Sequence, residues 1–109
     1  MPKRKPTERA RTARRAALRA TDKLARQRER LFQLEPGGSP ERPIDVDSSS
    51  VVEPRAAALE CPRCQLPFRV EAHRAPSSPG MRLREVEVSC SRCGQRRSIW
   101  FRLVGESLN

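Results

Sequence analysis

Two C-x-x-C pairs constrain this chain more than any other feature of its sequence. Cys61 and Cys64 form the first pair, and Cys90 and Cys93 form the second. Each C-x-x-C turn delivers two thiolates to one side of a metal ion. Two turns therefore supply the four soft ligands that tetrahedral Zn²⁺ binds at ~2.3 Å. The sequence predicts one metal ion held by Cys61, Cys64, Cys90 and Cys93.

Other uses of these cysteines fit the sequence less well. Disulfides need an oxidising compartment, and the basic start of the chain leads into more arginine rather than into the apolar stretch of a signal peptide. A redox C-x-x-C needs a helix N-terminus or a βαβ setting, which the pattern does not indicate. Iron in a rubredoxin-like site uses the same four thiolates, so the sequence does not exclude iron. Zinc is favoured because it is the more abundant metal with more precedent in such sites. The one histidine, His73, is expected at the surface or beside the ligands rather than as a ligand.

The residues around the second pair have the period of β-strands. Residues 68–73 can form one strand, 76–80 a turn, and 82–89 a strand that returns to the second cysteine pair. A third strand is expected over 97–104. Apolar and polar residues alternate along the last two strands, which predicts one core face and one outer face. The core face is expected to hold Val86, Val88, Cys90, Ile99, Phe101 and Leu103, and the outer face Trp100 and Arg102.

With two cysteine turns capping a small antiparallel sheet, residues 59–104 resemble a zinc ribbon. The resemblance implies a small metal-stabilised β fold with a three-stranded antiparallel sheet. Four thiolates leave no open coordination position, so the zinc would be structural. Gln65 departs from the commonest ribbon pattern, in which glycine follows the second cysteine, and a left-handed conformation there costs about 1 kcal/mol. Gly94 permits a positive φ at the same place in the second turn. The ribbon has too few apolar residues for a self-sufficient core, so its folding should depend on the metal.

A long basic helix is predicted before the ribbon. Residues 7–34 contain no glycine or proline and are rich in alanine and arginine, and the 35–38 segment gives a firm stop. The helix would span about 40 Å. Its apolar stripe is mostly alanine before Leu24, so only its last turns are expected to dock on another surface. Ala17, Leu24 and Leu31 have coiled-coil spacing, but Ala20 and Gln27 weaken such a seam.

The chain thus divides into a basic helical segment (1–35), an acidic linker rich in Pro, Gly and Ser (36–58) and the ribbon (59–109). The prolines and glycines of the linker predict irregular structure. Within it, Ile44–Val46 alternates like a short edge strand or an extended recognition peptide. Val51 and Val52 are expected to pack on the ribbon.

Charge is concentrated at the two ends of the chain. Lys and Arg number 23 against 13 Asp and Glu, and residues 1–35 alone hold 12 basic and 4 acidic side chains. This balance indicates a polyanionic partner, although a solvated arginine-rich helix is also compatible with it. The basic cluster at 3–5 resembles a nuclear-import signal, and the N-terminal segment resembles a mitochondrial presequence apart from its acidic residues and lack of early serine. The predicted nucleic-acid contacts are Arg14, Arg15, Arg19, Arg63, Arg92, Arg96, Arg97, Trp100 and Arg102.

No catalytic constellation or phosphate-binding loop is evident, so we expect a protein that is not an enzyme. The favoured function is a nucleic-acid-associated module of the transcription or translation machinery, with nucleic acid or a nucleic-acid-bound protein complex as partner. The alternative is a protein adaptor that docks through the helix end or through Ile44–Val46. We expect a monomer away from membranes, in the cytoplasm and near the nucleoid in a bacterium, or in the nucleus of a eukaryote.

Trp100 either stacks an unpaired base or is covered by the helix end near Phe32 or by the linker near Val51 and Val52.

Overall fold

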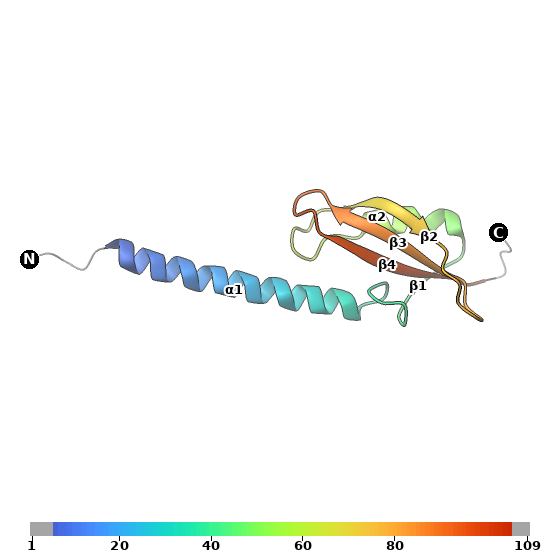
Figure 1. Ribbon diagram of the computed structural model, residues 1–109, viewed down its shortest axis with the longest axis horizontal. Coiled ribbons are helices and arrows are strands. Elements are labelled where there is room, and N and C mark those ends of the chain that lie inside the picture. The colour runs from blue at the N-terminus through green and yellow to red at the C-terminus, as the bar shows by residue number, and fades with distance from the viewer. Residues whose placement is uncertain (1–5, 106–109) are drawn as a thin grey trace, which may run out of the picture.

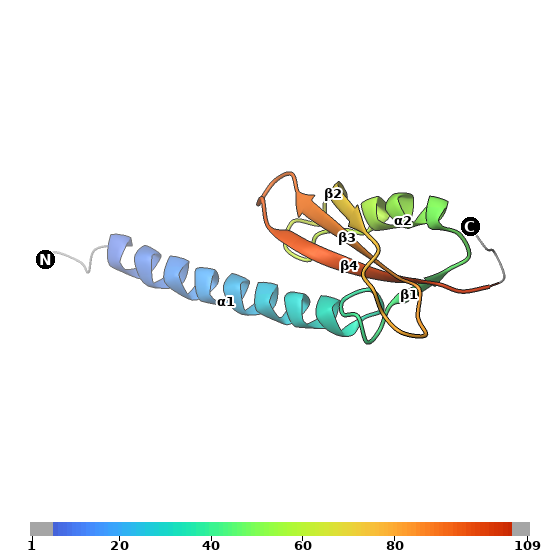
Figure 2. The ribbon, with the colours of Figure 1, turned by 45° about the vertical axis from the view of Figure 1, so that its right-hand side comes forward.

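The computed structural model describes residues 6–105, and it places one long helix beside a small twisted sheet (Figure 1). The basic cluster at 3–5 lies outside these residues. Helix α1 projects past one end of the sheet in both views (Figures 1 and 2). The elements are α1 (Pro6–Leu34), β1 (Ile44–Val46), the 3-10 helix η1 (Ser49–Val51), α2 (Val52–Ala58), β2 (Phe68–Arg74), β3 (Leu83–Cys90) and β4 (Arg96–Leu103). No helix among the described residues has both the length and the apolar character needed to cross a bilayer.

The sheet has four strands in the order β1-β4-β3-β2. Strands β2, β3 and β4 pair antiparallel, as expected for a zinc ribbon. The prediction of a three-stranded sheet was wrong, because β1 adds a fourth strand. Strand β1 pairs parallel with β4 and places Ile44 opposite Phe101. The Arg102 guanidinium also donates to both carboxylate oxygens of Asp45, at 2.8 and 3.0 Å. The sheet is therefore mixed, because a linker segment completes the edge of β4.

The core lies on the predicted face of the sheet. Val86, Val88, Ile99 and Phe101 are fully buried there. Helix α2 covers this face and contributes Val52 and Ala56, which lie one helical turn apart and are both buried. Among the described residues, the buried apolar ones are Val46, Val52, Ala56, Cys61, Phe68, Leu83, Val86, Val88, Cys90, Ile99, Phe101 and Leu103.

Helix α2 lies in the segment that was expected to be irregular. Its Pro54 occupies the first turn, where a missing N–H interrupts no helical hydrogen bond. Burial of Val52 and Ala56 stabilises a helix too short to persist by itself. His73 Nδ1 lies 2.9 Å from Glu53 Oε2, which connects α2 to β2. Burial of Val52 confirms that this residue packs on the ribbon, whereas Val51, expected to pack there too, is 39% exposed.

The chain turns sharply after α1, and the segment that follows runs beside β4. Gly37 has a φ of +94°, and its carbonyl accepts a hydrogen bond of 2.8 Å from the backbone N–H of Trp100. A Cβ at this position would lie 2.7 Å from Ile44 Cδ1. Only glycine therefore fits this turn without strain or a clash.

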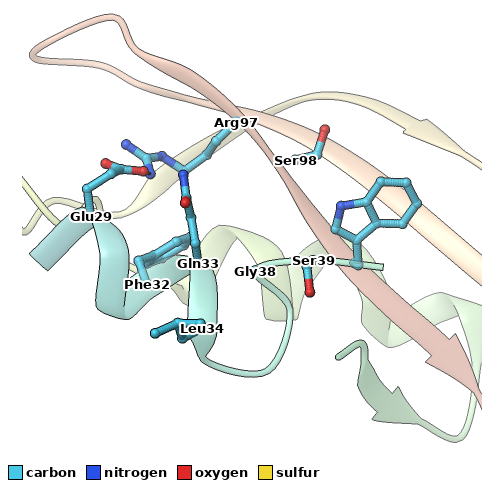
Figure 3. A pocket seen from close by; sticks show the side chains of 9 residues that line it. Glu29, Phe32, Gln33, Leu34, Gly38, Ser39, Arg97 and Ser98 are labelled. Carbon is cyan, nitrogen blue, oxygen red and sulfur yellow. Dashed lines mark hydrogen bonds and ion pairs between the residues drawn. The ribbon is translucent and has the colours of Figure 1, made fainter. Parts of the chain in front are cut away.

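Helix α1 is anchored to the sheet only through its last turns. Phe32 packs edge-to-face on Phe68, with 6.0 Å between the ring centroids. The Arg97 guanidinium lies 5.1 Å from the centroid of the Phe32 ring and forms an ion pair with Glu29 (Figure 3). Leu24, Leu31 and Leu34, which were expected to help dock the helix, remain 46%, 60% and 59% exposed. The docking face is that of Glu29 and Phe32, and the leucines lie on another face of the helix.

Candidate metal centre

The four cysteines come together at one end of the sheet. Their sulfur atoms all lie within 4.8 Å of one another, and Cys61 Sγ is 3.9 Å from Cys93 Sγ. Tetrahedral zinc with bonds of ~2.3 Å would place its ligand sulfurs about 3.8 Å apart. All four cysteines are free thiols. Cys61 and Cys90 are buried, Cys64 is half-buried and Cys93 is exposed, so the cluster lies at the edge of the core.

The two cysteine turns have the same backbone hydrogen bonds. In the first, the Gln65 N–H donates to the Cys61 carbonyl at 2.7 Å, and the Cys61 N–H donates to the Leu66 carbonyl at 3.0 Å. In the second, the Gly94 N–H donates to the Cys90 carbonyl at 2.9 Å, and the Cys90 N–H donates to the Gln95 carbonyl at 3.1 Å. Gln65 and Gly94 have φ of 59° and 73°. The left-handed conformation predicted at both positions is confirmed.

The surroundings of the sulfur atoms give Cys64 and Cys90 different pKa values. Backbone N–H groups of Cys93 and Arg92 lower the pKa of Cys90 to about 6, and the Arg92 N–H lies 3.4 Å from Cys90 Sγ. Burial, together with hydrogen bonds to Cys90 and Cys93, raises the pKa of Cys64 to about 12. Four adjacent thiols cannot all ionise without a compensating cation. A divalent metal ion that favours sulfur supplies that charge, so the donor set fits such an ion.

No family model, curated protein or solved structure matches this chain. The geometry of the cluster is the basis for assigning the site. Four cysteines placed to hold a metal ion, on two equivalent turns that flank a small sheet, are compatible with a zinc ribbon.

The residues predicted to contact nucleic acid lie on three parts of the molecule. Three arginines are exposed on α1, one is exposed in each cysteine turn, and the remaining four residues are on β4. The arginines of β4 already have acidic partners. Arg96 pairs with Glu87 at 2.9 Å, Arg102 with Asp45 at 2.8 Å, and Arg97 with Glu29. The side chain of Arg97 is only 8% exposed.

Arg97 anchors α1 to the sheet, a role not expected from the sequence. This residue continues the buried row of Ile99, Phe101 and Leu103 on β4, so a charged residue in that row was the available signal. A buried guanidinium needs a partner, and Glu29 and the two phenylalanine rings provide it. That partner is distant in the sequence, which a strand pattern alone does not reveal.

Trp100 is half-buried and lines a hollow between the end of α1 and β4. The hollow has a volume of about 430 Å³, and Figure 3 shows Gln33, Leu34, Gly38, Ser39 and Ser98 around it. Val52 is in the core with Ile99 and Phe101, on the other face of β4 from Trp100. The segment beside Trp100 is thus the end of α1 and the turn that follows it, rather than the linker near Val52.

Proposed function

We propose that residues 59–104 form a zinc ribbon with one structural zinc ion, in a chain that associates with nucleic acid and has no catalytic activity. Four soft ligands within 4.8 Å of one another support zinc, and a shell of four thiolates leaves no position for substrate. The partner is nucleic acid, or a protein complex already bound to nucleic acid. Helix α1 supplies most of the phosphate contacts.

The main support is a row of exposed arginines along α1, which we call the outer row: Arg11, Arg15, Arg19 and Arg26. With 3.6 residues per turn, these side chains fall within an arc of about 80° and extend over about 22 Å of helix. Each is exposed, and none has an ion pair with a described residue. The row therefore presents an unneutralised line of positive charge to solvent.

The exposed arginines of the two cysteine turns add a second basic region. Arg63 and Arg92 occupy the position before the second cysteine of each turn, and neither has an ion pair with a described residue. The arginines of β4 contribute less, because acidic neighbours already match their charges. Contacts of this kind bind phosphates without reading sequence.

A variant with the outer row changed to glutamine tests the proposal. Its affinity for both duplex DNA and RNA should fall regardless of sequence. The slope of log K against log salt, which is negative, should fall in magnitude by about 3–4, or roughly 0.9 per lost phosphate contact. Arg74→Gln is the control, because Glu87 already neutralises Arg74 at 2.9 Å. Nucleic-acid binding that is insensitive to salt, or that survives loss of the outer row, would contradict the proposal.

Two of the segments expected to serve a protein adaptor are used within the chain. Phe32 packs against Phe68, and Ile44–Val46 pairs with β4. The exposed leucines of α1 remain as the observation that favours an adaptor role.

A further inference from the structure

An apolar seam runs along α1 at alternating steps of three and four residues. Its apolar members are Ala10, Ala13, Ala17, Ala20, Leu24, Leu31 and Leu34, and one position holds the polar Gln27. All of these residues are exposed. This is the spacing by which one helix packs against another in a coiled coil. The leucines supply most of the apolar area, and the alanines of the first half allow a second helix to approach closely.

Docking of α1 on the sheet leaves the seam uncovered. Glu29 and Phe32 make the contacts to β4 and β2. Around the helix axis, Glu29 lies about 160° and Phe32 about 100° from the mean direction of the seam. The leucines of the seam accordingly keep about half of their area in solvent, from 46% at Leu24 to 60% at Leu31. Leu31 also borders a hollow of about 230 Å³ beside Pro62 and Gln65.

Basic side chains line both edges of the seam. Arg14 and Arg28 lie along one edge, and Arg9, Lys23 and Arg30 along the other. The edge positions between residues 9 and 34 contain no acidic side chain, and none of these five basic groups has an ion pair with a described residue. Such edge positions set partner choice in helix pairs through charge.

We infer that the seam docks an amphipathic helix of another protein that carries acidic residues along both edges of its own apolar stripe. Acidic edges would meet the unpaired basic residues of α1, whereas a second copy of this chain would place like charges opposite one another. The outer row of arginines lies on the far side of the helix and stays exposed in this complex. The inference therefore does not rest on the proposed binding of nucleic acid.

Three synthetic helical peptides, titrated into the full-length zinc-loaded protein, test this inference. The first has an apolar stripe with glutamate at both edges. The second has the same composition in scrambled order, and the third has lysine in place of the edge glutamates. Only the first should bind, and the double variant Leu24→Gln, Leu31→Gln should weaken its binding about tenfold or more, since two buried leucines are lost.

Leu18 provides a matched control. It is 61% exposed, similar to Leu31, but it lies away from the seam, so Leu18→Gln should leave peptide binding unchanged. Charge reversal by Arg14→Glu and Arg28→Glu should shift preference from the glutamate peptide towards the lysine peptide. The outer-row glutamine variant should bind the first peptide as the unmodified protein does, and zinc content checks that each variant is folded.

Several results would overturn the inference. If the scrambled peptide bound equally well, binding would depend on charge alone. If Leu18→Gln weakened peptide binding as much as the seam variant does, binding would not take place at the seam. Failure of the first peptide to bind would also overturn it. Sedimentation of the free protein as a dimer that Leu24→Gln and Leu31→Gln dissociate would assign the seam to a second copy of the chain instead.

Discussion

Gln65 and Gly94 occupy the same left-handed position in the two cysteine turns. The first turn places a residue with a Cβ where the second has glycine, although their backbone hydrogen bonds are the same. A Cβ in this conformation is close to the following carbonyl oxygen, which raises the energy of the folded state. Nothing lies within 4 Å of a Cβ built on Gly94, so the difference between the turns is one of backbone conformation only.

Single substitutions at these two positions should therefore change the stability of the protein in opposite directions. Gln65→Gly should raise the free energy of unfolding of the zinc-loaded protein by about 1 kcal/mol, and Gly94→Ala should lower it by a similar amount. Chemical denaturation at a fixed zinc concentration measures both changes. A loss of stability in Gln65→Gly would show that the glutamine side chain makes a contribution larger than its backbone strain.

Acidification should weaken metal binding, because protons compete for the thiolates. Cys64, with a pKa raised to about 12, holds its proton at neutral pH and must release it when the metal binds. Cys90, with a pKa lowered to about 6, is already a thiolate at neutral pH and takes up a proton only in more acidic solution. The affinity should fall with decreasing pH by about tenfold per unit for each proton released.

The pH dependence should also steepen by one proton below about pH 6, where Cys90 protonates in the metal-free protein. Competition with a chelator of known affinity, repeated across this pH range, measures the slope. An affinity that is independent of pH would contradict binding through the four thiolates.

At the scale of elements, the antiparallel strands were predictable and the linker elements were less so. Strands β3 and β4 follow from alternation, which places Val86 and Ile99 on one buried face, and β2 was expected as the strand that precedes the turn. Strand β1 has three residues, too few for an alternating pattern to distinguish an edge strand from a free peptide. Helix α2 is short and contains Pro54, so its existence depends on burial of Val52 and Ala56 by the sheet. The local sequence pattern alone does not predict that tertiary contact.

The attachment of α1 depends on Phe32 and can be tested by removing its ring. Phe32→Ala should release the last turns of the helix, with a loss of about 2 kcal/mol, less than for a fully buried phenylalanine. Amide exchange in these turns should accelerate, and acrylamide should quench Trp100 more strongly, because Phe32 and Trp100 line the same hollow.

Leu24→Ala is the control for this experiment, since Leu24 is exposed and lies outside the hollow. It should leave both the exchange rates of the last turns and the quenching of Trp100 unchanged. Unaltered quenching in Phe32→Ala would mean that α1 is held at β4 without this ring, mainly by Arg97 and Glu29.

At the scale of the whole molecule, the cysteine cluster was the most predictable part of the candidate site. Spacing alone brings Cys61 to Cys64 and Cys90 to Cys93, and the hairpin of β2 and β3 brings the two pairs together. The charge pattern of the surface was less predictable. Whether an arginine is free depends on folding, as for Arg97, whose partner Glu29 lies on α1.

The cysteine turns join three strands of the sheet at one of its ends. One turn leads into β2 and the other joins β3 to β4, while the part of the chain that the structure describes has twelve buried apolar residues. Structural zinc contributes ~10–16 kcal/mol in small domains, which is larger than the stability expected of such a core. Residues 9–24 of α1 are exposed throughout, so their helicity should not depend on the metal.

The central claim is that one zinc ion on four cysteines stabilises this sheet, and native mass spectrometry combined with amide exchange tests it most directly. Protein purified without added metal should contain about one zinc per chain, and Cys90→Ser should lose both the zinc and the protection of β2, β3 and β4, whereas Ser91→Ala in the same turn should keep them. A strong chelator should unfold the sheet of the unmodified protein in the same way. A protected sheet in metal-free protein, or a stoichiometric disulfide among these cysteines, would contradict the claim.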